Sequence, residues 1–276
     1  MKFFPLQNRL TEHITGWKIW YFVFLFLVLM ISSVAIAALG TVLPLKNLGA
    51  PIQMLLMPLV GFALVWLFSS KKPTKRDLGL DKGVNSRALI IILAVFAVTH
   101  LIFYLLAKMS GMSSDTVELF REYGFRDGFW GSFWAVISTV ILAPVCEEIL
   151  YRGLMLRTVH DGLAGKFPEN KALWSLPVIV SVIAVAVAFI LPHVEDLRFD
   201  VMSLAYFVTS AGFSLVYIFT RSLSAAMVSH SLQSCFAFFP ILLYGRGDTE
   251  VHPIIYIIAF TCPLIVYFIG FLLRKI

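Results

Sequence analysis

Long apolar runs alternate with short polar connections over almost the whole chain. Each run is about as long as the roughly 20 residues that an α-helix needs to cross the hydrocarbon core of a bilayer. A transmembrane barrel would instead show short segments of alternating polarity. The pattern therefore predicts an all-α polytopic membrane protein with about eight transmembrane helices. Their expected ranges are 17–40, 51–68, 88–107, 129–159, 172–191, 201–220, 223–244 and 253–273.

The composition agrees with this prediction. Of 276 residues, 59% are hydrophobic and only 14% are charged, whereas a soluble domain carries about 25% charged residues. We expect residues 1–276 to form a single integral-membrane domain, with residues 1–16 as a polar cytoplasmic leader. Residues 113–127, with apolar positions at helical spacing, predict a short amphipathic helix on the membrane surface. Residues 161–171 are expected to form a polar loop.

The distribution of charge predicts the orientation of the chain. Most of the 22 lysines and arginines lie in the leader, in the 71–87 loop, between residues 152 and 171, and at the C-terminus. These segments share one side of an eight-span chain, so the positive-inside rule places both termini in the cytoplasm and predicts a multi-pass protein of the plasma membrane. The net charge is +6, but the basic residues form no stripe with interleaved aromatic residues. The expected partner is therefore the lipid bilayer and not a nucleic acid.

Three ionisable side chains interrupt the fourth apolar run. Glu147 and Glu148 are adjacent, and Arg152 follows Glu148 by four residues. Ionisable groups inside a membrane are costly and indicate a functional site. Glu148 and Arg152 have the spacing of a helical ion pair, which leaves Glu147 without a local partner and makes it the candidate general base. The next charge, Arg157, is expected to extend toward the membrane interface.

Two further polar clusters contain histidine. His193 ends the fifth apolar run, and His230 lies in the seventh with Ser234 four residues later on the same helical face. One carboxylate and two imidazoles from three helices suit peptide hydrolysis, because water needs a base and the tetrahedral oxyanion needs donors. The same set, Glu147, His193 and His230, could instead bind zinc. No H-E-x-x-H motif is present.

These three motifs resemble those of the CAAX-protease and bacteriocin-processing (CPBP, Abi) family of intramembrane proteases. The resemblance covers about residues 130–240 and places the motifs on the fourth, fifth and seventh helices, where it predicts the active site. In chain order, the residues that carry it are Glu147, Glu148, Arg152, Phe189, His193 and His230. Three motifs in the family's order make a specific signal, whereas one alone would be weak.

The resemblance implies an endopeptidase that hydrolyses a membrane-associated peptide or protein. Glu147 and His193 match the water-activating pair, and His230 matches the first oxyanion donor. The supporting residues implied are Glu148, Arg152, Ser234 and Phe189. We expect a glutamate mechanism without a required cofactor. The alternative is a divalent metal such as zinc, held by Glu147, His193 and His230.

One departure from the family keeps a second function open. The family's third motif has asparagine four residues after the histidine, where this chain has Ser234. Loss of one oxyanion donor can lower the rate about a hundredfold or more. The alternative is therefore a catalytically lapsed member that acts as a binding, regulatory or bacteriocin self-immunity protein. A proton-coupled transporter is a further rival, although no repeated half is visible.

The predicted spans also create a geometric conflict. They place Glu147 toward the cytoplasmic end of the fourth helix and His193 at the outer end of the fifth. The two residues can meet only if the fourth helix is long and tilted or the fifth is short within the membrane.

Overall fold

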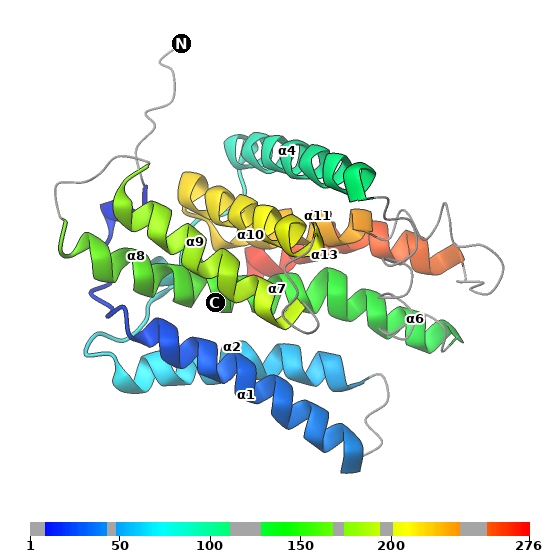
Figure 1. The fold of residues 1–276 in the computed structure, drawn as a ribbon, viewed down its shortest axis with the longest axis horizontal. Helices are drawn as coiled ribbons and strands as arrows, with labels where there is room; N and C mark the ends of the chain where they lie inside the picture. Colours follow the sequence, from blue (N-terminus) through cyan, green and yellow to red (C-terminus); the bar gives the residue numbers. More distant parts are fainter. Residues whose placement is uncertain (1–8, 43–47, 111–127, 168–173, 194–200, 238–252) are drawn as a thin grey trace.

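The computed structural model describes residues 9–42, 48–110, 128–167, 174–193, 201–237 and 253–276. Every regular element in these residues is a helix, which confirms the all-α prediction. Figure 1 shows a bundle in which α1 and α2 form one layer and α4, α10, α11 and α13 lie on the opposite side. The main helices around the centre are α1 (Tyr21–Val42), α2 (Gly49–Phe68), α4 (Ser86–Ser110), α9 (Leu176–Ile190), α10 (Val201–Thr220), α11 (Leu223–Ala237) and α13 (Pro253–Lys275).

The centre of the bundle is one continuous helical rod, Gly128–Ala164, of 37 residues. It has the largest buried share of the membrane-spanning candidates in the described residues. Two π-helical stretches interrupt its α-helical geometry, a feature that often marks functional sites. Its segments are α6 (Gly128–Val136), η4 (Ile137–Leu142), α7 (Ala143–Glu148), η5 (Ile149–Leu156) and α8 (Arg157–Ala164). Glu147 and Glu148 therefore lie near its middle, between the two π-helices.

A proline explains part of this irregular geometry. Pro144 has no N–H with which to bond the carbonyl of Val140, four residues earlier. The hydroxyl of Ser231, on α11, donates to that carbonyl oxygen at 2.7 Å. A side chain from a neighbouring helix thus supplies the donor that proline lacks, as membrane helices require in the absence of water. The bond also ties α11 to the central rod.

Six helices of the described residues are long and apolar enough to cross a membrane. The multi-pass architecture is therefore confirmed, whereas the count of about eight spans is not. A shorter apolar stretch, Tyr21–Ser32, lies in α1. The described part of α11 has 15 residues, about 22 Å at the rise of an α-helix, and the rest of the predicted 223–244 span lies outside the described residues. The predicted surface helix at 113–127 lies outside the described residues.

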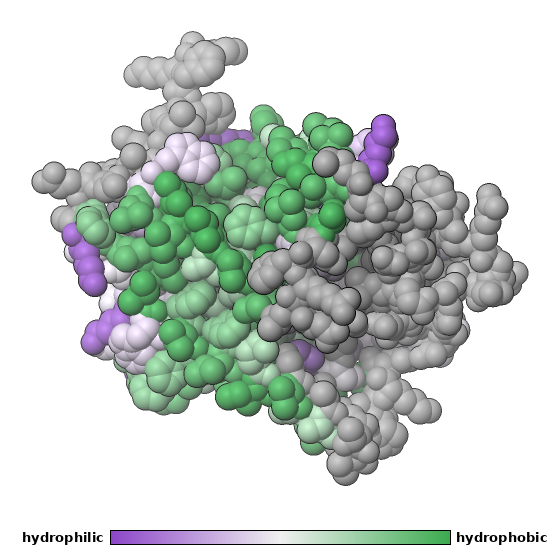
Figure 2. Space-filling view, viewed as in Figure 1, coloured by the Kyte–Doolittle hydropathy of each residue, from purple (hydrophilic) through white to green (hydrophobic). Residues whose placement is uncertain are grey.

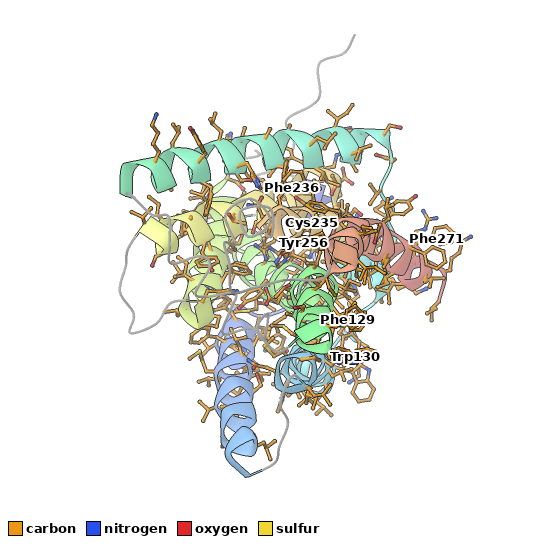
Figure 3. All side chains as sticks on the ribbon, turned by 90° about the vertical axis from the view of Figure 1, so that its right-hand side faces the viewer. Phe129, Trp130, Cys235, Phe236, Tyr256 and Phe271 are labelled. Atoms are coloured by element: carbon orange, nitrogen blue, oxygen red, sulfur yellow. The ribbon has the colours of Figure 1, made fainter. Side chains whose placement is uncertain are left out.

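The exterior of the helices is apolar. Large hydrophobic side chains are exposed along α1, α2, α4 and α13, and they cover much of the described face in Figure 2. In Figure 3, α4 crosses the upper side of the bundle, and only 11% of its apolar window is buried. Phe236 of α11 lies just beneath it (Figure 3), with its ring 4.9 Å from that of Phe96. Such surfaces suit contact with lipid.

The N-terminal segment packs into one end of the bundle. Both the backbone N–H and the hydroxyl of Thr15 donate to Asp161 Oδ2, at 3.0 and 2.9 Å. Arg157 pairs with the same carboxylate at 2.9 Å and donates to the carbonyl oxygen of His13. The prediction that Arg157 extends to the membrane interface is therefore wrong, because its side chain is buried by the N-terminal segment. The predicted 161–171 loop also begins later, since α8 continues to Ala164.

A short helix, α3 (Lys75–Leu78), completes this end of the molecule. Thr74 and Asp77 form a capping box at its start, and the imidazole of His13 hydrogen-bonds Asp77. Gly79 ends the helix in the left-handed conformation, with φ of 78°, which glycine adopts at little cost. The buried carboxylate of Asp77 thus joins the N-terminal segment to the loop between α2 and α4.

Candidate active site

A buried chain of hydrogen bonds links two of the three predicted motifs. Arg152 Nη1 donates to Glu148 Oε1 at 2.9 Å, as the i,i+4 spacing predicts. The same carboxylate oxygen lies 2.9 Å from Nδ1 of His230, on α11. Glu148 and Arg152 are fully buried, and His230 is nearly so. The seventh predicted span thus meets the fourth through Glu148 rather than through Glu147.

The Arg152 guanidinium is held on several sides. Its Nη2 donates to both the backbone carbonyl and the hydroxyl oxygen of Ser210, at 2.6 and 2.7 Å. Its central carbon lies 5.8 Å from the ring centroid of Tyr151 and 5.4 Å from those of Phe189 and Phe213. A guanidinium over aromatic faces gains cation–π stabilisation, which is largest away from water. These contacts balance part of the cost of burying a positive charge.

His193 belongs to the same cluster through Phe189. After Ile190 the chain leaves α-helical geometry for a short 3-10 turn, Leu191–His193, which Pro192 favours because it lacks an N–H. The His193 ring stacks on the ring of Phe189 at 4.5 Å, and Phe189 in turn contacts the His230 ring at 6.0 Å. The motif on the fifth predicted span therefore lies beside the other two.

The hydrogen bonds of the two histidines indicate which ring nitrogens remain available. Nδ1 of His193 lies 2.6 Å from the carbonyl oxygen of Phe189. A carbonyl can only accept, so this nitrogen donates and a neutral His193 keeps its lone pair on Nε2. Nδ1 of His230 likewise faces an oxygen that already accepts from Arg152. In both rings, Nε2 is the nitrogen left for chemistry.

Glu147 is buried, with 4% of its surface exposed. Its Oε2 atom has no hydrogen-bond partner among the described residues. No hydrogen bond joins it to His193 or His230 within the same part of the chain. A carboxylate oxygen that is buried without a donor is unusual in proteins and calls for an explanation. Glu148 Oε2 shares this property, so the unpaired oxygen does not distinguish the two glutamates and the role of Glu147 as base stays a prediction.

The remaining predicted supporting residue is Ser234. It lies half-buried on α11, one helical turn beyond His230. The neighbouring Gln233 is turned toward α4, where its Oε1 accepts from the Thr99 hydroxyl at 3.4 Å. Gln233 is therefore engaged elsewhere, and Ser234 is the side chain at the position of the family's asparagine.

The described residues contain no group of three or more His, Cys, Asp and Glu side chains arranged to hold a metal ion. The alternative ligand set, Glu147, His193 and His230, is therefore not assembled as a metal site there. The expectation of a reaction without a required metal stays a prediction.

Sequence reasoning missed the contribution of α10. Ser210, Phe213 and Tyr206 contact the motif side chains, yet they lie in an ordinary apolar run without charged residues. Helical spacing alone would have assigned these residues to the packed core. The long central rod and the short α9 bring the two motif segments together at Phe189 and Tyr151, whose ring centroids lie 5.1 Å apart, whereas the meeting of Glu147 with His193 stays a prediction.

Fold and site together define a multi-pass helical membrane protein with a buried carboxylate–guanidinium–imidazole cluster. Residues 129–236 match the family model described as Rce1-like, type II CAAX prenyl endopeptidase. The match supports membership of the CAAX-protease family and lies almost entirely within the 130–240 region predicted from the motifs. No curated protein and no solved structure matches the chain.

Proposed function

We propose that the protein is an intramembrane endopeptidase of the CAAX-protease type, which cleaves a membrane-associated peptide or protein. The observation that carries this proposal is the buried Arg152–Glu148–His230 chain, located within the segment that matches the Rce1-like model. Burying these charged groups has a high desolvation cost. Because the chain lies beside His193, we attribute that cost to a catalytic role.

In the proposed reaction Glu147 is the general base. It takes a proton from a water molecule, whose oxygen attacks the carbonyl carbon of the scissile peptide bond. Nε2 of His193 accepts a hydrogen bond from the same water and orients it. When the tetrahedral intermediate collapses, the C–N bond breaks and Glu147 returns the proton to the leaving amine.

His230 stabilises the negative charge that develops on the carbonyl oxygen. In its protonated form, Nε2–H donates to the oxyanion of the tetrahedral intermediate, while Glu148 holds Nδ1–H and faces the positive charge. Arg152 fixes the Glu148 carboxylate in that orientation. Ser234 is the proposed second donor, in place of the family's asparagine. No metal is required in this scheme.

The substrate is proposed to reach the site from the bilayer, with both chain termini in the cytoplasm and the protein in the plasma membrane. The apolar exterior of α4 and α1 is consistent with a lipid-embedded enzyme. The family model's description suggests a prenylated C-terminus as the first substrate to try. An unprenylated leader-type peptide is the second.

The test is cleavage of a fluorogenic peptide by the purified protein in lipid nanodiscs, with prenylated and unprenylated versions. We expect Glu147→Gln and His193→Ala to lower kcat by at least about a hundredfold, while His100→Ala, a matched histidine outside the site, retains turnover. Equal rates for wild type and Glu147→Gln would exclude the proposed reaction. Addition of a chelator should leave the rate unchanged.

The same assay addresses the lapsed-member alternative, which the serine at position 234 favours. If wild type is inactive but Ser234→Asn restores cleavage, the chain is a binding or regulatory protein that lost its second donor. If wild type cleaves and Ser234→Ala slows it, serine serves as that donor.

A further inference from the structure

We propose that α10, which carries none of the motif residues, supplies three positioning residues for the reaction: Tyr206, Ser210 and Phe213. The inference rests on the proposed function. These residues are spaced i, i+4 and i+7, so they form a single stripe on one face of the helix. In Figure 1, α10 lies between α4 and α9, and it packs against α4, α9 and α11.

Ser210 positions the guanidinium. Arg152 Nη2 is shared between its hydroxyl and its carbonyl oxygen, so one serine accepts twice from a single nitrogen. Ser214 also donates to that carbonyl oxygen at 3.0 Å, which holds it in place. With Nη2 fixed, the fork of the guanidinium directs Nη1 at Glu148. Ser210 is fully buried.

Phe213 positions the first imidazole. Its ring stacks on that of His230 at 4.5 Å with an interplanar angle of 20°. Stacking restricts rotation of the imidazole about its side-chain bonds, and the Glu148 contact at Nδ1 fixes the remaining choice of orientation. Nε2, the proposed oxyanion donor, is thereby held in one direction. Phe213 also contacts Arg152, so the same ring supports both ends of the buried chain.

Tyr206 positions the second imidazole. Its ring centroid lies 5.0 Å from that of His193, which also stacks on Phe189 at 4.5 Å. His193 is the last residue of the 3-10 turn, and the residues after it lie outside the described part of the chain. Ring contacts from two helices therefore hold it where its own helix has ended.

A stripe of apolar and small residues at helical spacing is ordinarily a packing surface. Here each of the three residues contacts a different motif side chain: Tyr206 touches His193, Ser210 bonds Arg152, and Phe213 stacks on His230. A packing surface would contact apolar neighbours, whereas this stripe contacts the Arg152 guanidinium and both motif imidazoles. Holding reacting groups in a productive geometry is worth large rate factors, and α10 is placed to do so.

The proposal is tested with Ser210→Ala, Phe213→Leu and Tyr206→Leu in nanodiscs. We expect each to lower kcat at least about tenfold with KM changed less than about twofold, because the lost contact serves the transition state. The conservative variants Ser210→Thr and Tyr206→Phe keep the hydroxyl and the ring, and should recover most of kcat. The matched controls are Ser181→Ala, a fully buried serine that bonds its own helix, and Phe219→Leu, farther along α10.

A spectroscopic measurement separates this proposal from the proposed function. In histidine-labelled protein, the ring-current shift of His230 should decrease in Phe213→Leu, leaving only the contribution of Phe189, and should be unchanged in Phe219→Leu, whether or not the protein cleaves peptides. If wild type is inactive but shows this shift, the proposed peptidase activity is refuted and the contact between Phe213 and His230 is retained. Active wild type with unchanged kcat in Ser210→Ala and Phe213→Leu would overturn the positioning role. Equal losses in the two control variants would overturn it as well.

Discussion

At the scale of single residues, the geometry of Arg152 determines whether the site can exist in an apolar interior. Its two terminal nitrogens serve Glu148 and Ser210 at once. A lysine could not, because its single ammonium lacks the planar fork. The ion pair itself follows from the i,i+4 spacing of the sequence. The contact of Glu148 with His230 does not, because 82 residues separate them and no local pattern encodes the meeting.

Removal of the arginine should leave a buried carboxylate without its countercharge. We expect Arg152→Met to lower the free energy of unfolding by about 3–5 kcal/mol, the usual result of breaking a buried pair by removing one partner. The double variant Arg152→Met/Glu148→Gln should recover at least half of that loss while remaining inactive. Thermal unfolding in detergent measures both. A double variant no more stable than Arg152→Met would contradict the pairing.

At the scale of elements, the central rod shows what sequence patterns can and cannot predict. Apolar length correctly predicted that the motif segment is a long apolar helix, and Pro144 lies in the short α-helical segment between its two π-helical stretches. The two π-helical stretches could not be predicted, because they depend on partners from other helices, such as Ser231. The role of α10 was hidden for the same reason: its residues act through contacts and not through charge.

Ser231 offers a direct test of that coupling. Ser231→Ala removes the hydroxyl that stands in for the missing N–H of Pro144, and we expect a loss of about 1–3 kcal/mol. Ser181→Ala should cost less, because its hydroxyl bonds a carbonyl within its own helix. Pro144→Ala in the Ser231→Ala background should restore part of the loss, since alanine returns the N–H. Equal unfolding temperatures for the two serine variants would show that Val140 needs no outside donor.

At the scale of the whole molecule, a second polar network holds one end of the bundle together. It connects the N-terminal segment to α8 through Asp161 and to α3 through Asp77. The sequence predicted a polar leader but not the contacts of residues 9–16 with α8 and α3, because charges near a membrane surface usually remain solvated. Arg157 is the clearest example: its position suggested the interface, whereas the N-terminal segment covers it.

This network predicts a dependence of stability on pH. Burial alone would raise the pKa of Asp77, but hydrogen bonds from Thr74 and His13 and the charge of Lys71 lower it below the ordinary 3.8. A carboxyl whose pKa is lowered in the folded state stabilises the fold above its ordinary pKa, and this contribution is lost as the pH falls through the lowered value. Between about pH 5 and pH 3, wild type should therefore lose more thermal stability than Asp77→Asn.

The matched control is Asp81→Asn, which removes a more exposed carboxylate of the same loop. Its unfolding temperature should follow that of wild type over this range. If Asp77→Asn and wild type declined in parallel, the contribution of Asp77 to the network would be refuted.

The bond between Thr15 and Asp161 joins residues 146 positions apart. The ribosome releases Thr15 long before Asp161, because α1, α2, α4 and most of the central rod are synthesised in between. Residues 9–16 therefore cannot form their contacts with α8 until α8 has been synthesised. The earliest part to be synthesised is among the last to find its place, so a bulky fusion just before Arg9 should hinder maturation more than the same fusion after Ile276.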